Sequence, residues 1–439
     1  MNTTGVFRRA WCAIALPAML LATTHTVCAQ DAQASGDHAH MNMANMQGTS
    51  LFPSREASGT AWLPQVTPMY AYHREVGDWQ LMLHGNAFLQ YLRDSGDRGH
   101  DQLGSINWVM LMARHEVGAG RVGLRTMFSA EPWTIDGCGY PDLFASGEQC
   151  GGTINHDIQH PHDLFMELAA EYVQPINETM NWQVYGGPAG EPALGPVAFP
   201  HRPSAMPNPI APISHHWLDS THVSFGVVTS GVYTAMWKAE ASVFNGREPD
   251  EHRRNLDLAA LDSYSGRFWY MPTDQWALQV SAGHLTDAEA TDTPGLRTTL
   301  NRITASATWH RPIGSDGLWA TTAAWGRNSA SFEATQAVML ETSVAPNAHD
   351  AWYGRFEVNG KAGHDLSVAA ADEVFTLSKI QAGYTRYLGE SGGLVPGVGI
   401  TASAAVAPAS LASVYGGRVN VGVGVYLTIR PAGHRMEGR

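Results

Sequence analysis

Apolar and polar residues alternate with a period of two through most of this chain, from residue 77 to residue 430. Successive side chains of a β-strand point to opposite faces, so such a segment has one apolar face and one polar face. About sixteen of these segments, each of roughly ten residues, follow one another, which is typical of a transmembrane β-barrel with lipid outside and water inside. The segment 418–430 shows the pattern most clearly, since small or polar residues alternate there with Val419, Val421, Val423, Val425, Leu427 and Ile429.

The connections between these segments alternate between long and short. Outer-membrane barrels have long loops outside the cell and short turns in the periplasm, so this rhythm predicts that both ends of the barrel lie in the periplasm. The turn at 328–332 breaks the rhythm, which keeps fourteen strands open as an alternative to sixteen. The predicted antiparallel strands are, approximately, 79–91, 106–116, 121–132, 163–174, 181–189, 221–231, 232–244, 262–271, 275–285, 301–311, 318–328, 332–344, 351–360, 374–388, 394–406 and 417–430.

Aromatic residues near the predicted strand ends suit the interfacial girdles of such a barrel. A large soluble β-sandwich or solenoid is the alternative, but a soluble sheet would need a second layer over its aliphatic faces, and the sequence shows none. The tryptophans that we expect in the girdles are Trp79, Trp108, Trp182, Trp217, Trp269, Trp276, Trp309, Trp319, Trp325 and Trp352.

The net charge of the chain indicates which classes of partner it can bind. It contains 27 basic and 40 acidic residues, for a formal net charge of −13. This balance argues against nucleic acid as a partner and favours cations in an aqueous lumen. The partners that we expect are outer-membrane lipid, small solutes or ions, and the barrel assembly machinery, while the oligomeric state stays open.

The first 29 residues are expected to be a cleaved signal peptide, with Arg8 and Arg9 before the apolar stretch Trp11–Ala22. The predicted organisation continues with a flexible periplasmic tail (30–76), the outer-membrane barrel (77–430) and a short C-terminal tail (431–439).

Cys138 and Cys150 lie in a glycine-rich segment of the exported part of the chain. Because export leads to an oxidising compartment, we predict a disulfide between them. A metal-binding thiol pair is the alternative.

The predicted tail contains the sequence DHAHMNMANM, with His38, His40, Met41, Met43 and Met46. Thioethers are soft ligands that select Cu(I), and imidazole binds copper or zinc. These residues could therefore converge on Cu(I) without a fold. The alternative is an unstructured linker whose composition has no ligand role.

Two further clusters flank the long connections 133–162 and 190–220, which we expect on the extracellular side. Seven prolines stiffen the second connection, which could turn inward as a constriction. Neutral imidazoles with carboxylates could hold a divalent metal there, and hydrogen bonds that merely pack the loops are the alternative. The clusters contain His156, Asp157, His160, His162 and Asp163, and His201, His215, His216, Asp219 and His222.

The sequence resembles two groups of exported barrels. Its His/Met-rich tail and general architecture resemble the B-type copper-resistance outer-membrane proteins, which implies a Cu(I)-binding tail. A second resemblance is to an uncharacterised family of bacterial outer-membrane, porin-like barrels, which implies fold and location. The motifs that carry this second resemblance are TPMYAYH (67–73), LMLHGN (81–86), QHPHDLFMELA (159–169), YGGPAGEPALGP (185–196), HRPSA (201–205), HHWLDSTHVSFGVVTSG (215–231), FNGREPDE (244–251) and LDSYSGR (261–267).

The predicted function is passage or binding of small solutes, including metal ions, at the outer membrane. We expect no enzymatic activity and no required cofactor, with Cu(I) or a divalent metal as the candidate ligand. The alternatives are a copper-resistance barrel with a Cu(I)-binding tail and a hydrolase at the barrel rim. The hydrolase could draw its catalytic groups from His215, His216, Asp219, Ser220 and His222, but the sequence contains no G-x-S-x-G nucleophile elbow.

Overall fold

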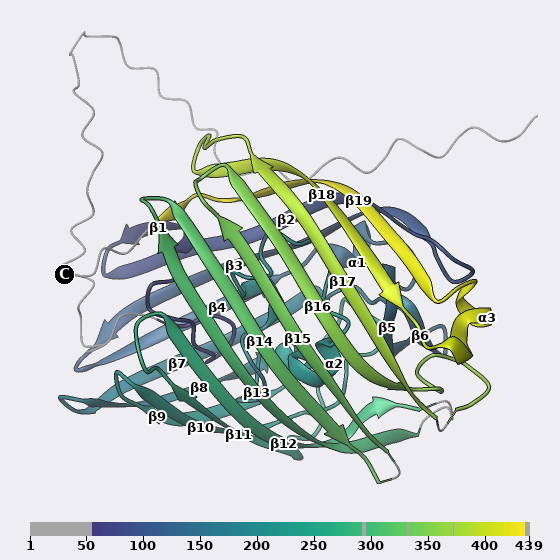
Figure 1. Cartoon of the computed structure of the whole chain (residues 1–439). Helices are drawn as coiled ribbons and strands as arrows, with labels where there is room; N and C mark the ends of the chain where they lie inside the picture. The colour runs from purple at the N-terminus through teal and green to yellow at the C-terminus, as the bar shows by residue number, and fades with distance from the viewer. Residues whose placement is uncertain (1–54, 292–295, 332, 372, 435–439) are drawn as a thin grey trace, which may run out of the picture. The chain divides into compact units, whose positions relative to one another are not determined.

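The computed structural model describes residues 55–291, 296–331, 333–371 and 373–434. The expected signal peptide and the His/Met segment with His38, His40, Met41, Met43 and Met46 lie outside the described residues. In the described part, sixteen long antiparallel strands form a barrel in which β19 pairs with β2 and closes the sheet (Figure 1). No helix in this part is both long and apolar enough to cross a membrane.

The sixteen strands match the sixteen predicted segments, so the sixteen-strand prediction is confirmed and the fourteen-strand alternative is wrong. At the position that raised the alternative, two separate strands form a hairpin with Ser329 opposite Ala334. The strands are β2 (Trp79–Asp94), β3 (Asp101–Val117), β4 (Gly120–Phe128), β7 (Phe165–Asn177), β8 (Met180–Ala189), β9 (Val227–Tyr233), β10 (Trp237–Phe244), β11 (Ser263–Tyr270), β12 (Trp276–Ala290), β13 (Arg297–Ile313), β14 (Gly317–Ser329), β15 (Ala334–Ala345), β16 (Asp350–Ala362), β17 (Val374–Tyr387), β18 (Leu394–Val406) and β19 (Val419–Pro431).

The alternation in β19 has the predicted orientation. The aliphatic side chains from Val419 to Ile429 are 40–59% exposed and point outward. The intervening Asn420, Tyr426 and Thr428 are at most 5% exposed and point into the lumen. An apolar outer surface and a polar interior are what a bilayer requires of a barrel wall.

The seam of the barrel has an additional strand. β19 pairs with β2 only from Asp94 to Ala87, which leaves the first part of that edge of β2 uncovered. β1 (Met69–Val76) pairs with this part, and β20 (Gly433–His434) pairs with β1. The flexible tail was predicted to extend to residue 76. Residues 69–76 instead form a strand, because the backbone N–H and C=O groups at the uncovered edge of β2 bind them.

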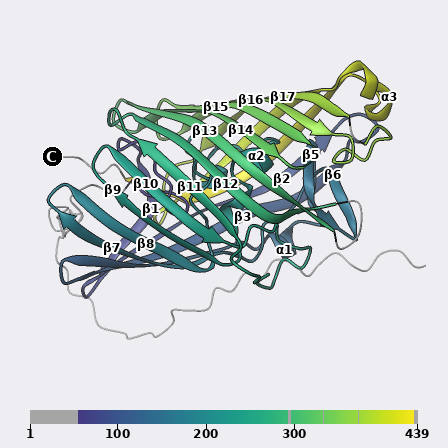
Figure 2. The same cartoon turned by 90° about the horizontal axis from the view of Figure 1, so that it is seen from below.

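The short elements lie in the connections. β5 (Tyr140–Cys150) and β6 (Thr153–Gln159) form a separate hairpin near the end of the barrel that carries α3 (Ala412–Tyr415), as both views show (Figures 1 and 2). This is the end with the long loops, and we call it the long-loop end; the opposite end is the short-turn end. The remaining helices are α1 (Glu131–Thr134), α2 (His215–Leu218), η2 (Phe199–His201), η3 (Ser220–His222) and η4 (Ala409–Leu411).

Three tryptophans predicted for the interfacial girdles face the lumen instead. Trp217 and Trp269 are at most 3% exposed, and Trp108 packs against the ring of His201 at 4.6 Å. Trp217 belongs to α2 in the connection before β9, because that strand begins at Val227 and not at 221. Tyr233, the last residue of β9 before the hairpin turn at 234–236, also faces inward and is 6% exposed.

Candidate functional site

The connection 190–226 fills the middle of the barrel, in agreement with the predicted inward fold of the proline-rich loop. Nearly all of its residues are buried. Arg202 ties it to the barrel wall, because its guanidinium lies 3.1 Å from a carboxylate oxygen of Glu341 on β15. Arg355 on β16 contacts the other oxygen of Glu341 at 2.6 Å. We call residues 190–226 the plug loop.

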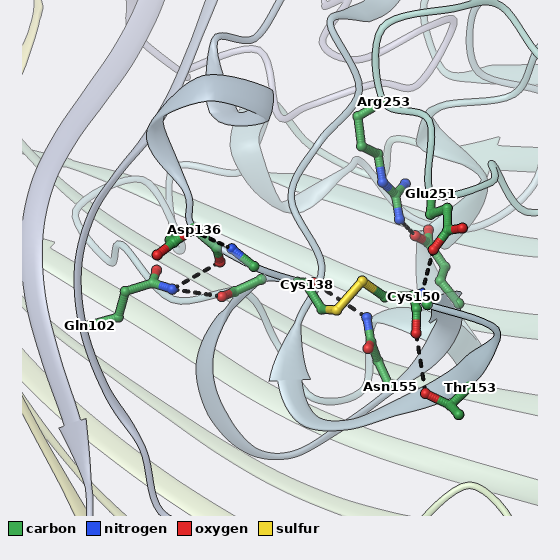
Figure 3. The surroundings of a disulfide bond; sticks show 12 residues. Gln102, Asp136, Cys138, Cys150, Thr153, Asn155, Glu251 and Arg253 are labelled. Carbon is green, nitrogen blue, oxygen red and sulfur yellow. Dashed lines mark hydrogen bonds and ion pairs between the residues drawn. A yellow bond between two sulfur atoms is a disulfide. The ribbon is translucent and has the colours of Figure 1, made fainter. Parts of the chain in front are cut away.

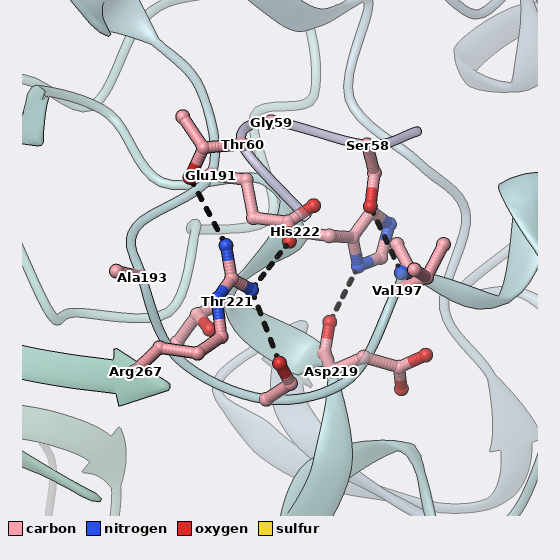
Figure 4. Close-up of polar contacts among 12 residues, drawn as sticks. Ser58, Gly59, Thr60, Glu191, Ala193, Val197, Asp219, Thr221, His222 and Arg267 are labelled. Carbon is pink, nitrogen blue, oxygen red and sulfur yellow. Dashed lines mark hydrogen bonds and ion pairs between the residues drawn. The ribbon is translucent and has the colours of Figure 1, made fainter. Parts of the chain in front are cut away.

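A second segment enters the barrel from the short-turn end. Residues 55–68 run along the interior, where Arg125 donates hydrogen bonds to the carbonyls of Ala57 and Gly59. Arg267 on β11 joins this segment to the plug loop, because its guanidinium contacts both Thr60 (3.1 Å) and Glu191 (3.4 Å; Figure 4). We call residues 55–68 the inner segment.

Together the plug loop and the inner segment divide the lumen. A cavity of about 500 Å³ opens at the long-loop end, and we call it the vestibule. A cavity of about 60 Å³ lies against the inner segment and β2, and we call it the inner cavity. The two share no lining residue among those that the structure describes.

Histidines from two distant connections meet beneath the vestibule. His160 and His162 come from the connection before β7, and His215, His216 and His222 come from the plug loop. Neighbouring rings in this group lie 5.1–6.0 Å apart between centroids. The sequence predicted two separate loop clusters; the structure brings these five imidazoles into one, which we call the histidine cluster.

Each of the five imidazoles has an oxygen atom within hydrogen-bond distance of Nδ1, and for His160 it is the carbonyl of Pro161, at 3.3 Å. This arrangement fixes the ring orientation and leaves Nε2 on the opposite side, as in metal sites where the second ring nitrogen is bound by a carboxylate or carbonyl. The Nε2 atoms of His216 and His222 are buried without a hydrogen-bond partner. The other Nδ1 partners are Glu131 for His162 (2.9 Å), Asp219 for His215 (2.9 Å), Glu248 for His216 (2.8 Å) and the Asp219 carbonyl for His222 (2.8 Å).

Burial controls the charge of the cluster. It lowers the pKa of His160, His215 and His222 below the usual value for histidine. His162 is the exception, because the Glu131 carboxylate outweighs the effect of burial and raises its pKa. Most of the cluster is therefore neutral near pH 7, which is the form of imidazole that binds metals.

The wall of the vestibule adds carboxylates. His216, Glu248 and Glu289 place one ligand atom each within 4.8 Å of one another. Glu333, His364 and Asp365 form a second group of this kind on the same cavity. The sequence reasoning missed these acidic ligands, because they come from four different connections and strand ends with no local motif.

The other predicted residues of the loops have structural partners. Asp157 contacts His156 at 3.0 Å and Arg98 at 3.2 Å, while Asp163 contacts Arg253 at 3.3 Å. These contacts fasten the loop 129–164 and do not belong to the histidine cluster.

Cys138, just before β5, and Cys150, the last residue of β5, form a disulfide (Figure 3). Gln102 on β3 donates to the carbonyls of Asp136 (3.1 Å) and Gly139 (2.9 Å), which fastens this loop to the barrel wall. Both thiols are consumed in the bond, so the alternative of a metal-binding thiol pair does not hold.

The geometry gives no support to a rim hydrolase. Among the described residues, no hydroxyl is hydrogen-bonded to a ring nitrogen of the histidine cluster. Ser220, the nucleophile of that alternative, accepts a hydrogen bond from Arg302 at 2.9 Å. A serine nucleophile needs a base within hydrogen-bond reach, and the described histidines do not provide it.

The comparisons with known proteins point to the porin fold. No protein-family model matches the sequence, and no curated protein matches it. Among solved structures, OmpF of Salmonella typhi in complex with daunomycin is similar over 81% of this chain and 100% of its own, with 11% identity and a TM-score of 0.50. OprB of Pseudomonas putida (9% identity, 80% of this chain and 94% of its own, TM-score 0.47) and the outer membrane channel DcaP of Acinetobacter baumannii (9%, 82% and 100%, TM-score 0.46) also match. At these identities the likeness concerns the fold, and the resemblance to copper-resistance proteins stays an expectation.

Proposed function

We propose that this chain is an outer-membrane, porin-like barrel that admits small cations and binds a divalent metal ion in its lumen. The observation that carries the proposal is the histidine cluster, in which three buried and two half-buried imidazoles lie beneath an acid-lined vestibule. A lumen that only passed neutral solutes would have no need for imidazoles oriented in this way. Imidazole with carboxylate is a ligand combination suited to zinc and other divalent transition metals.

The vestibule supports this proposal by its charge. Five carboxyl groups line it against one arginine, Arg297, and they belong to Glu148, Glu248, Glu289, Glu333 and Asp365. A concave surface with an excess of one sign of charge concentrates ions of the opposite sign and raises their association rate. The vestibule would therefore collect cations and deliver them to His216, which lies on its floor.

The orientation follows from the connection lengths. Long loops face the outside of the cell in outer-membrane barrels and short turns face the periplasm. The vestibule would then open to the exterior and the inner segment would enter from the periplasm. Movement of the plug loop or the inner segment would widen the path between the two cavities, because both segments lie inside the lumen.

The proposal is tested by metal binding and conductance on the purified full-length protein. Isothermal titration with Zn²⁺ should show binding that is lost in a His215→Ala/His222→Ala variant and kept in a His252→Ala control. His252 is a suitable control because its side chain is 75% exposed on the connection 245–262. Planar-bilayer recordings should show cation-selective openings. Zn²⁺ affinity that is the same in all three proteins, together with a silent bilayer, would overturn the proposal.

A further inference from the structure

The lumen faces of β2 and β3 carry an unusual set of side chains next to the inner cavity. Met82 lies directly opposite Met112, and His84 lies directly opposite Met110. Directly opposed residues in an antiparallel pair have Cβ atoms roughly 4.5–5.5 Å apart. The four side chains therefore form a block of two by two, three thioethers and one imidazole, on a wall that is otherwise mostly polar. We call it the thioether block.

Two contacts place His84 between the thioethers and the plug loop. Nε2 of His84 lies 3.0 Å from Sδ of Met110. The ring of His201, from the plug loop, lies 5.4 Å from that of His84. His201 is only 8% exposed, and it lines the inner cavity. An imidazole on a cavity wall can bind a ligand in that cavity.

The inner cavity provides the space for that ligand. Its volume of about 60 Å³ exceeds the roughly 15 Å³ that a single water-sized sphere needs. Its lining includes the charged residues Glu56, Arg55 and Arg430. It also includes four thioethers and two imidazoles, those of Met69, Met82, Met112, Met206, His84 and His201.

Simple packing accounts for only part of this methionine-rich region. Met127 and Met166 belong to the same apolar cluster and pack with Val223 and Phe225 of the plug loop, but they do not line the inner cavity. Flexible thioethers commonly fill irregular gaps in this way. Met82 and Met112 differ, since they border empty space together with two imidazoles.

We infer that the thioether block, with His201, binds a soft monovalent metal ion, Cu(I) or its analogue Ag(I). Thioethers and imidazole are neutral ligands, and thioethers select Cu(I) over harder ions that prefer carboxylate oxygen. The inference deepens the proposed function, on which it rests for the entry of ions, by naming a second class of cation on the periplasm-facing side of the plug. The ligands thus change along the lumen from carboxylate and imidazole in the vestibule to imidazole and thioether at the inner cavity.

The test is a Cu(I) titration of the full-length protein against a chromogenic Cu(I) chelator, under reducing agents that spare the Cys138–Cys150 bond. Wild type should retain one more Cu(I) per chain than a Met82→Leu/Met112→Leu variant. A Met127→Leu/Met166→Leu variant is the matched control and should retain as much as wild type. All three proteins keep the N-terminal His/Met segment, so that segment does not contribute to the difference. X-ray absorption of the wild-type complex should show sulfur scatterers that weaken in the first variant alone.

Each result of these experiments either supports or overturns the inference. Equal Cu(I) retention in wild type and Met82→Leu/Met112→Leu would overturn the inference, and so would equal loss in both double variants. Leucine keeps the volume of methionine, so folding should survive, and heat-modifiable migration in gels checks this. Should the first variant fail to fold, His201→Gln in the plug loop replaces it with the same expected loss of one Cu(I). Equilibrium binding of Cu(I) does not depend on conduction. Cu(I) retention, with silent bilayers and a Zn²⁺ affinity that the His215→Ala/His222→Ala variant leaves unchanged, would overturn the proposed function only. Cation-selective openings and Zn²⁺ binding without the difference in Cu(I) retention would overturn this inference only.

Discussion

Arg202 donates from its guanidinium to the carboxylate of Asp219 at 2.6 Å, and both side chains are about 1% exposed. The other carboxylate oxygen of Asp219 lies 2.9 Å from Nδ1 of His215. Asp219 therefore connects two functions of the plug loop. It neutralises the arginine that fastens the loop to Glu341 on the barrel wall, and it orients an imidazole of the histidine cluster.

Asp219→Asn should weaken both the plug and the metal site. Removing one partner of a buried ion pair costs about 3–5 kcal/mol, and the retained contact of Arg202 with Glu341 places the expected loss at the lower end of that range. Zn²⁺ affinity should fall by about 10- to 100-fold, as is usual when a group that orients a ligand is lost. Denaturant unfolding in detergent and Zn²⁺ titration measure the two effects. Asp250→Asn, on an exposed loop, should change neither.

Glu56→Gln should open the lumen from the short-turn end. Glu56 lies on the inner segment and contacts Arg121 at 3.0 Å, and Arg114 as well. Burial alone would raise its pKa, but these arginines outweigh burial and hold the pKa at about 2. The carboxylate is thus ionised and fastens the segment at every ordinary pH. The amide cannot pair with two buried guanidinium groups, so the segment should leave the lumen more often.

Single-channel recording measures this as an increase of several-fold in open probability. Glu75→Gln is the control, because Glu75 is exposed on β1. The expected pH dependence is a flat open probability of the wild type down to about pH 4. A carboxylate whose pKa is lowered by folding stabilises the folded state above its unfolded pKa, and this stabilisation fades only as the pH falls towards 2. Equal open probabilities for wild type and Glu56→Gln would show that the inner segment does not close the lumen.

Glu191 should make the plug less stable as the pH rises. It is buried in the plug loop, and burial raises its pKa to about 7 although Arg267 opposes the shift. A carboxyl group with a raised folded-state pKa contributes stability below about pH 4.5 that is lost as the pH rises through 7. Stability should therefore decline by roughly 1–3 kcal/mol between pH 4.5 and 7.5. Chemical denaturation across this range measures the decline, and Glu191→Gln should flatten it. A slope unchanged in that variant would assign the effect to other groups.

The barrel wall was predictable because its pattern is local. Alternation in β19 needs only neighbouring residues to show which side chains face lipid, and each of the sixteen strands carries some form of it. Girdle assignments were less secure for Trp217 and Trp269, because an aromatic residue near a strand end suits either a membrane interface or a packed lumen. Trp269 faces the lumen because it lies opposite the buried Lys238 of β10. Trp217 lies in α2 inside the lumen, because β9 starts only at Val227.

The interior of the barrel was not predictable in the same way. His160 and His215 lie 55 positions apart in the sequence, and nothing local indicates that their loops meet. Glu248 and Glu289 join them from a different connection and from the end of β12. The inner segment has no alternation at all, so the sequence suggested a flexible tail. Its order comes from contacts with buried arginines on β4 and β11, which are distant from it in the sequence.

The disulfide should stabilise the loop rather than the barrel. Cys138 and Cys150 are 12 positions apart, and closing a loop of about this size is worth roughly 3 kcal/mol in the chain-entropy model. A Cys138→Ser/Cys150→Ser variant should therefore be cleaved faster by proteases within 129–164, while its heat-modifiable barrel band stays unchanged. Limited proteolysis followed by mass spectrometry locates the cuts. Loss of the barrel band would show instead that this loop is required for the barrel to form.

The cost of an arginine on the outward face of β19 should depend on its depth in the bilayer. Val423 is 56% exposed near the middle of the strand, and Val419 is 59% exposed at its first residue. Arginine on the lipid face of a barrel costs about 2–4 kcal/mol at the midplane and about 0–1 kcal/mol near the interface. Val423→Arg should thus lower the free energy of unfolding in phospholipid vesicles several times more than Val419→Arg does. In a water-soluble barrel both positions would face water, and the two variants would behave alike. Equal, small losses for both would therefore contradict a membrane-spanning wall.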